Sequence, residues 1–126
     1  GRRHALGGTF YEPTVIVGAT PRMRVYAEET FGPVSPLFPF DSEDEVIRLA
    51  NDAEHGLAAY FYTHDLGRAH RVAEALATGM VGINTGMITT VAAPFGGIKQ
   101  SGIGREGGAY GLEEFMDVKY VCTAGL

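Results

Sequence analysis

The sequence predicts an α/β fold with a mostly parallel sheet whose strands are joined by crossover helices. Segments rich in β-branched and aromatic residues alternate with segments whose apolar residues recur at helical spacing. The connections between these segments are short, which is typical of right-handed crossovers between parallel strands. We expect strands at residues 14–17, 34–40, 57–62 and 80–83, and helices that follow Ser42 and Asp65.

The first predicted strand begins at Thr14, because Pro13 lacks the backbone N–H that a strand ladder needs. Residues 23–29 can form a short helical turn. The second strand, at residues 34–40, contains two prolines. Since proline is confined to edge strands and irregular ladders, we expect an edge or irregular strand here.

The first long helix is predicted to begin beside Ser42. Ser42 and Glu45 have the spacing of a capping box, in which each side chain bonds the backbone amide of the other residue. One apolar face follows at helical spacing and consists of Val46, Leu49, Ala50 and Ala53. We expect the helix to end at His55 and Gly56.

The next segment, residues 57–62, is almost wholly apolar, as in a strand that is buried on both faces. Asp65 then caps a second helix, and Gly79 is predicted to end it because a left-handed C-cap favours glycine. Residues 80–83 form the following strand.

After residue 83 the alternation stops, and residues 84–111 contain no convincing periodic element. A loop of this length is usually functional or an assembly surface. Within it Gly102, Gly104 and Gly107 match G-x-G-x-x-G, but the apolar strand and the helix that flank a phosphate-binding turn are missing from the pattern. We therefore interpret this match as coincidental.

Residues 113–121 resume strand-like alternation without an obvious hairpin partner, so this terminal strand is predicted to pair with another chain. Cys122 follows directly. Its apolar and aromatic neighbours indicate a packed thiol rather than a nucleophile.

Composition indicates one soluble domain of 126 residues, with 45% hydrophobic and 20% charged residues. The net charge of −5, without a basic stripe, argues against nucleic acid as a partner. No apolar run is long enough for a membrane span. The single cysteine excludes an internal disulfide and fits a reducing compartment, so we expect a cytoplasmic location. The start lacks methionine and a signal peptide, which suggests an internal beginning.

Residue spacing by itself indicates no reaction. The four histidines are His4, His55, His64 and His70. They lack the spacing of metal ligands, so no metal site is expected. Glu28 and Glu29 are adjacent and cannot act as a paired acid and base in a helical turn. Two surface carboxylates are the simplest interpretation, and one carboxylate turned inward is the alternative.

Two motifs occur in one order with an α/β stretch between them: EETFGP at residues 28–33 and PFGGIKQSGIGRE at residues 94–106. Together with GMVGIN at residues 79–84, they resemble the aldehyde dehydrogenase superfamily over essentially the whole chain. More narrowly, the chain resembles the succinate-semialdehyde dehydrogenases in RRHALGGTFYEPT, NDAEHGLAAYFYTHDLGRAHRVAEAL, GMVGINTG and VKYVCTAGL.

This resemblance implies oxidation of an aldehyde through a thiohemiacetal on a catalytic cysteine, with NADP or NAD as hydride acceptor and a glutamate-activated water. In the family these two catalytic residues and the nucleotide-binding domain lie upstream of the matched region, and Cys122 does not match the nucleophile. The chain is therefore expected to be the C-terminal part of a catalytic domain, without catalytic residues and inactive alone. It should also expose apolar surface at residues 14–17, at residues 57–62 and in the long loop.

The resemblance also implies four binding residues. Glu29 matches a cofactor residue whose carboxylate accepts hydrogen bonds from both ribose hydroxyls on the nicotinamide side, and Phe31 matches an aromatic that packs near the nicotinamide. Phe95 matches a substrate contact in the loop of residues 85–97. Thr89 stands where succinate-semialdehyde enzymes have a serine that helps to hold the substrate carboxylate, and threonine keeps that hydroxyl while adding a methyl group.

The resemblance divides the chain into residues 1–111, the C-terminal portion of the catalytic domain, and residues 112–126, an oligomerisation strand and tail. The implied partners are the upstream part of the same enzyme, a small aldehyde, and further copies in a dimer or tetramer. Lys99, Ser101 and Arg105 are expected to serve loop shape and subunit contact more than chemistry. One alternative stays open, namely a stand-alone interaction module that binds a partner chain through its terminal strand and glycine loop.

Overall fold

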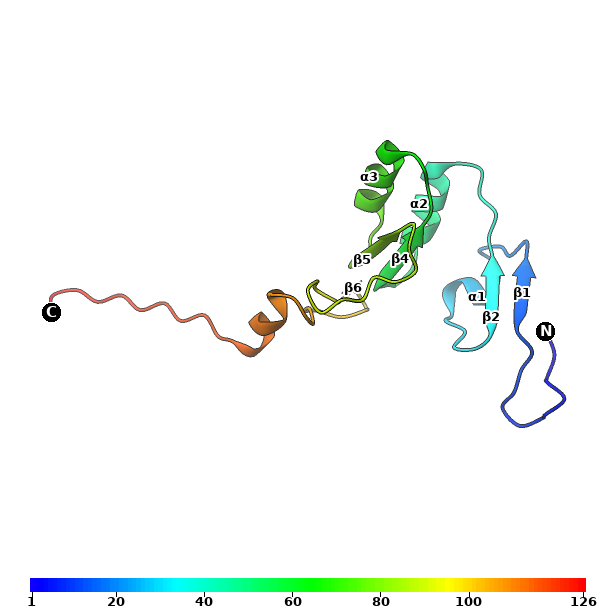
Figure 1. Ribbon diagram of the computed structural model, residues 1–126, viewed down its shortest axis with the longest axis horizontal. Coiled ribbons are helices and arrows are strands. Elements are labelled where there is room, and N and C mark those ends of the chain that lie inside the picture. Colours follow the sequence, from blue (N-terminus) through cyan, green and yellow to red (C-terminus); the bar gives the residue numbers. More distant parts are fainter. The chain divides into compact units, whose positions relative to one another are not determined.

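The computed structural model describes residues 1–126, which form two units, Gly1–Val46 and Ile47–Leu126. The strands hydrogen-bond in three pairs: β1 with β2, β4 with β5, and β3 with β6. The first two pairs are parallel (Figure 1). The third is antiparallel, and together the pairs confirm the α/β class with mostly parallel strands. None of the helices has both the length and the apolar character that crossing a bilayer would require.

The first unit is a parallel strand pair with a short helical crossover. Its elements are β1 (Thr14–Val17), α1 (Arg24–Ala27) and β2 (Val34–Leu37). The predicted start at Thr14 and the helical turn are confirmed. β2 ends at Leu37 rather than at residue 40, because Gly18 turns β1 away with a φ of 68° and leaves no ladder partner beyond that point.

Only one face of this pair is covered within the unit. Ala19 is 2% exposed, and the ring of Tyr26 packs edge-on against Phe38 with 5.5 Å between the ring centroids. Val15 and Val17 on the ladder are 62% and 80% exposed. The expected apolar surface at residues 14–17 is therefore present.

Helix α2 (Glu43–Asn51) begins where the capping pattern predicts. The Oγ of Ser42 accepts a hydrogen bond of 3.1 Å from the backbone N–H of Glu45. The carboxylate of Glu45 accepts from the backbone N–H of Asp41 at 2.8 Å, not from that of Ser42. The backbone N–H that Glu45 binds therefore belongs to the residue before the one that the capping box predicts.

The end of α2 differs from the prediction. The helix ends at Asn51 and not at His55 and Gly56. The carbonyl oxygens of Asn51 and Ala53 accept hydrogen bonds of 2.7 and 2.9 Å from Nζ of Lys99. Because Lys99 is remote in sequence and supplies these partners, the chain leaves the helix without a local stop signal.

The second unit is built around a parallel pair whose crossover is α3. Its elements are β3 (His55–Gly56), β4 (Ala58–Phe61), α3 (Leu66–Ala75), β5 (Met80–Ile83), β6 (Ile98–Lys99) and a 3₁₀ helix (Tyr110–Phe115). Helix α3 packs against β5, and Val72 on α3 is 7% exposed. The predicted strand at residues 80–83 is confirmed.

Helix α3 is capped as predicted but ends earlier. Oδ1 of Asp65 accepts a hydrogen bond of 2.8 Å from the backbone N–H of Arg68. The helix ends at Ala75, and its C-cap, Leu76, is extended, so the prediction of a left-handed cap at Gly79 is wrong. Gly79 is needed for space instead, because a Cβ there would collide with the carbonyl group of Gly96.

The prediction that residues 57–62 are buried on both faces is also wrong. Leu57 is 42% exposed, Tyr60 48% and Tyr62 72%. A parallel pair needs cover on both faces, and this unit has too few elements to supply it. The exposure agrees with the expectation of uncovered apolar surface in this segment.

The predicted terminal strand is absent within the chain. Residues 113–115 belong to the 3₁₀ helix, and residues 116–126 join no ladder (Figure 1). Cys122 is exposed, so the packed-thiol interpretation is wrong for the isolated chain. A strand needs a neighbour for its backbone groups, and no other segment of the chain provides one. Pairing with another chain stays a prediction.

Candidate functional site

The segment between α1 and β2 carries Glu29 and Phe31. The adjacent Glu28 is engaged, because Nε and Nη2 of Arg24 donate hydrogen bonds of 3.0 and 2.7 Å to its carboxylate. This contact raises the pKa of Arg24. Glu29 is exposed and makes no hydrogen bond, so neither carboxylate turns inward and the surface interpretation is confirmed.

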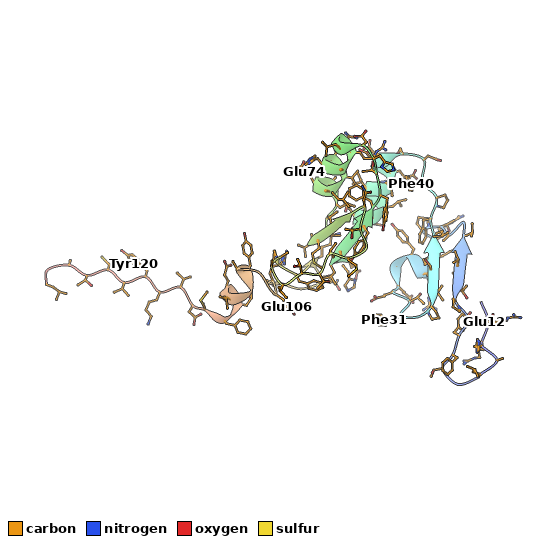
Figure 2. The ribbon with its side chains drawn as sticks, in the orientation of Figure 1. Glu12, Phe31, Phe40, Glu74, Glu106 and Tyr120 are labelled. Atoms are coloured by element: carbon orange, nitrogen blue, oxygen red, sulfur yellow. The ribbon has the colours of Figure 1, made fainter.

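Phe31 is 97% exposed and lies in the first of two consecutive tight turns. The N–H of Gly32 donates to the carbonyl of Thr30 at 2.8 Å, and that of Val34 donates to the carbonyl of Gly32 at 2.8 Å. Figure 2 shows Phe31 at this turn. A free carboxylate and an uncovered aromatic ring thus lie two residues apart, and this pair of groups fits a ribose with two hydroxyl donors beside a planar ring.

The loop of residues 85–97 begins at the carboxyl end of β5, the end of a parallel strand at which α/β proteins bind ligands. The hydroxyl of Thr85 closes a local turn, since it accepts from the N–H of Met87 at 3.1 Å and donates to the carbonyl of Met87 at 3.3 Å. Thr89 is exposed, and its hydroxyl has no partner in the chain. It is therefore free to bond a ligand.

Phe95 is half-buried at the far end of this loop. Its N–H and carbonyl exchange two hydrogen bonds of 2.7 Å with Glu106. Phe95 lines a groove of about 400 Å³, together with Leu57, Gly96, Gly97, Ser101, Ile103, Gly104, Arg105, Glu106, Gly107, Gly111, Glu114 and Phe115. Thr89 is not part of that lining, so the second unit does not bring its two predicted binding residues into one cavity.

Three polar side chains bind backbone groups and shape the glycine-rich loop. Lys99 donates to two carbonyl groups at the end of α2. Oγ of Ser101 accepts from the N–H of Gly56 at 3.0 Å. Nη1 of Arg105 donates to the carbonyl groups of Gly97 and Gly104 at 2.8 and 2.7 Å. The prediction that these residues serve loop shape is confirmed, while their part in subunit contact stays a prediction.

The G-x-G-x-x-G match is not a phosphate cradle. The strand before it, β6, has two residues, and the helix after it is a 3₁₀ helix. The N–H groups of Glu106 and Gly108 are already bonded, to the carbonyl groups of Phe95 at 2.7 Å and Val91 at 3.0 Å. Because the flanking strand and α-helix of a phosphate-binding turn are absent, the coincidental interpretation is confirmed.

Sequence reasoning missed one residue beside the candidate loop. Asn84 has a positive φ of 57°, and its side-chain amide forms two hydrogen bonds of 2.8 Å with the backbone of Thr63. Asparagine is enriched at positive φ, so Asn84 at the end of a predicted strand carried a weak signal. Its partner lies 21 residues earlier, which no local pattern could reveal.

The model of the aldehyde dehydrogenase family matches residues 1–121. The chain belongs to the aldehyde dehydrogenase family. It is 60% identical to the 3-sulfolactaldehyde dehydrogenase of Pseudomonas putida and 56% identical to the glutarate-semialdehyde dehydrogenase of Pseudomonas aeruginosa. Each match covers 100% of this chain and 26% of the relative, so the chain spans about a quarter of their length.

Solved structures of the aldehyde dehydrogenase family have the same local fold. The crystal structure of succinate-semialdehyde dehydrogenase from Burkholderia pseudomallei superposes with a TM-score of 0.94 at 62% identity. That likeness covers 99% of this chain and 26% of the solved chain. The agreement confirms that this chain is a small α/β part of an aldehyde dehydrogenase domain.

Proposed function

We propose that this chain is the C-terminal segment of an NAD(P)-dependent aldehyde dehydrogenase that oxidises succinate semialdehyde to succinate. The observation that carries the proposal is similarity, over 99–100% of this chain and 26% of each relative, to three enzymes named for succinate semialdehyde, glutarate semialdehyde and 3-sulfolactaldehyde. Each of these aldehydes bears a carboxylate or a sulfonate. The substrate class that they share is a short aldehyde with an anionic end.

In this proposal the first unit binds the nicotinamide half of the cofactor, which accepts the hydride when it is bound. The exposed, unpaired carboxylate of Glu29 accepts hydrogen bonds from the two ribose hydroxyls. The ring of Phe31 packs near the nicotinamide and limits its motion. Both side chains lack partners in the chain, which leaves them available for these contacts.

The loop of residues 85–97 is proposed to wall the aldehyde site. The free hydroxyl of Thr89 donates a hydrogen bond to the anionic end of the substrate, and Phe95 contacts its carbon chain. Both are substrate contacts, and neither carries out the chemistry. The catalytic cysteine and the general-base glutamate are proposed to lie in the upstream part of the enzyme, so the chain is inactive alone.

The assembled enzyme is proposed to be a cytoplasmic dimer or tetramer. Residues 116–126 supply the exposed, unpaired segment for contact between copies, with Val118 102% and Val121 73% exposed. The same observation supports the alternative class, a stand-alone interaction module. An assay separates the two.

The test is to combine this chain with the upstream part and to measure NADH or NADPH formation with succinate semialdehyde. Activity that needs both parts supports the proposal, whereas no activity together with a stable isolated fold favours the interaction module.

Glu29→Gln should raise the KM of the cofactor, with about a tenfold loss of kcat/KM. Glu28→Gln is the matched control, because Glu28 already binds Arg24. Equal effects of the two substitutions would contradict the role of Glu29.

The substrate assignment has its own test. Thr89→Val keeps the size of the side chain and removes the hydroxyl. It should reduce kcat/KM for succinate semialdehyde more than for an uncharged aldehyde of the same length, because only the former loses a hydrogen bond to a charged group. Similar losses for both aldehydes would argue against a contact with the anionic end.

A further inference from the structure

Asn84 stands where the loop of residues 85–97 leaves β5. Its φ of 57° lies in the left-handed region, which is strained for a residue other than glycine unless neighbouring groups hold it. Lys99 is the other such residue in the chain. An observed strain of this kind calls for a physical cause, and the contacts of Asn84 provide one.

Three hydrogen bonds fasten Asn84 to the last residue of β4 and to Thr63 just after that strand. Oδ1 of Asn84 accepts from the N–H of Thr63 at 2.8 Å, and Nδ2 donates to the carbonyl of Thr63 at 2.8 Å. The backbone N–H of Asn84 donates to the carbonyl of Phe61 at 2.9 Å. The two-point contact with one peptide residue restrains the side chain, and the side chain in turn holds the left-handed backbone.

The residues after Asn84 fold back over β5. A Cβ on Gly82 would lie 2.8 Å from the carbonyl oxygen of Thr85 and 2.9 Å from Cγ2 of Ile88. Gly82 is buried, so the start of the loop is seated directly on this strand. The left-handed turn at Asn84 therefore sets the direction in which the loop leaves the sheet.

We propose that Asn84 is a positioning residue for the first part of the substrate loop and thereby determines where Thr89 lies. The inference rests on the proposed function, which assigns Thr89 to aldehyde binding. Asn84 acts through the loop and does not touch the substrate. Its substitution should therefore change the KM of the aldehyde while the KM of the cofactor stays the same.

Three substitutions at Asn84, made in the enzyme assembled from this chain and its upstream part, separate backbone from side chain. Asn84→Ala loses both side-chain hydrogen bonds and disfavours the positive φ. Asn84→Gly loses the bonds but permits the φ, and Asn84→Asp permits the φ and keeps the acceptor. We expect kcat/KM for succinate semialdehyde to fall about tenfold in the Ala variant, less in the Gly variant and least in the Asp variant.

The other asparagine of the chain is a matched control. Nδ2 of Asn51 donates to the carbonyl of Ala75 at 2.8 Å, and Oδ1 accepts from the N–H of Ala77 at 2.7 Å. Asn51→Ala removes an equal pair of backbone contacts at the end of α2. It should lower the Tm and leave the KM of the aldehyde unchanged. An equal rise in KM for Asn51→Ala and Asn84→Ala would reflect general destabilisation and overturn the proposal.

A measurement without substrate separates this inference from the proposed function. Amide hydrogen exchange should become faster at residues 85–92 in Asn84→Ala and stay unchanged there in Asn51→Ala. Unchanged exchange in the Asn84 variant would overturn the positioning role even if the enzyme oxidises aldehydes. Conversely, a wild-type assembly that oxidises no aldehyde would refute the proposed function, while faster exchange in this loop would still show that Asn84 holds it.

Discussion

The glycine-rich loop at residues 94–106 and the terminal segment at residues 116–126 both lack long regular elements, yet they differ in how their polar groups are satisfied. In the loop, Lys99, Ser101 and Arg105 make five hydrogen bonds to backbone groups. The terminal segment is exposed and joins no ladder. Side chains thus satisfy backbone groups of the irregular loop, whereas the terminal segment has no ladder partner within the chain, and its pairing with another chain stays a prediction.

The largest expected effect concerns the close contact between Gly79 and Gly96 of the glycine-rich loop. Gly79→Ala places a Cβ against the backbone of Gly96, which has no flexible side chain to move aside. We expect the assembled enzyme to lose about 1–3 kcal/mol of unfolding free energy, or to fail to assemble. Urea unfolding measures this. Gly86→Ala is the control, because a Cβ at Gly86 meets nothing within 4 Å. If both variants unfold at the same urea concentration, the loop is not seated through Gly79.

The next effect tests the dependence of the terminal segment on a partner. The isolated chain should associate through its uncovered apolar surfaces, and sedimentation should give a mass well above 13.5 kDa. Removal of residues 116–126 should weaken association in both the isolated chain and the assembled enzyme, because it removes an unpaired segment. A monodisperse monomer that unfolds cooperatively would contradict this expectation for the intact chain.

The smallest expected effect concerns the N-cap of helix α3, which involves neither the glycine-rich loop nor the terminal segment. The hydrogen bond from the backbone of Arg68 lowers the pKa of Asp65 below 3.8. A lowered folded-state pKa contributes stability that is present above the unfolded value and is lost as pH falls through the folded one. The Tm difference between wild type and Asp65→Asn should therefore be a few degrees or less at pH 7, decrease as the pH falls below 3.8, and vanish below the folded-state pKa of Asp65. A difference independent of pH would show that the charge of Asp65 contributes nothing.

Local patterns predicted the elements whose causes are local. Thr14, Asp65 and the Ser42–Glu45 pair act within a few residues, and the structure confirms the starts of β1, α3 and α2. The helix ends were predicted too late. The end of α2 involves the distant Lys99, and α3 ends before the glycine that was expected to cap it.

The candidate site was likewise predictable only where the signal is a local motif. Motif resemblance indicated Glu29, Phe31, Thr89 and Phe95, and their free or groove-lining side chains fit the proposed binding roles. The hydrogen bonds between Asn84 and Thr63 were not predictable, because they join the segments that follow β5 and β4, which are 21 residues apart in the sequence. Burial was overestimated at residues 57–62, since the pattern implies a covering layer that this chain does not contain.

The sequence by itself determined the α/β class, the starts of β1, β2, β5, α2 and α3, and membership of the aldehyde dehydrogenase family. Each of these depends on residues close together in the chain or on a motif. Only the tertiary structure decided why Gly79 must be glycine and how Lys99 and Arg105 shape the glycine-rich loop. It also decided how Asn84 is held at the start of the loop of residues 85–97. These features depend on contacts between segments distant in sequence, and such contacts exist only once the chain has folded.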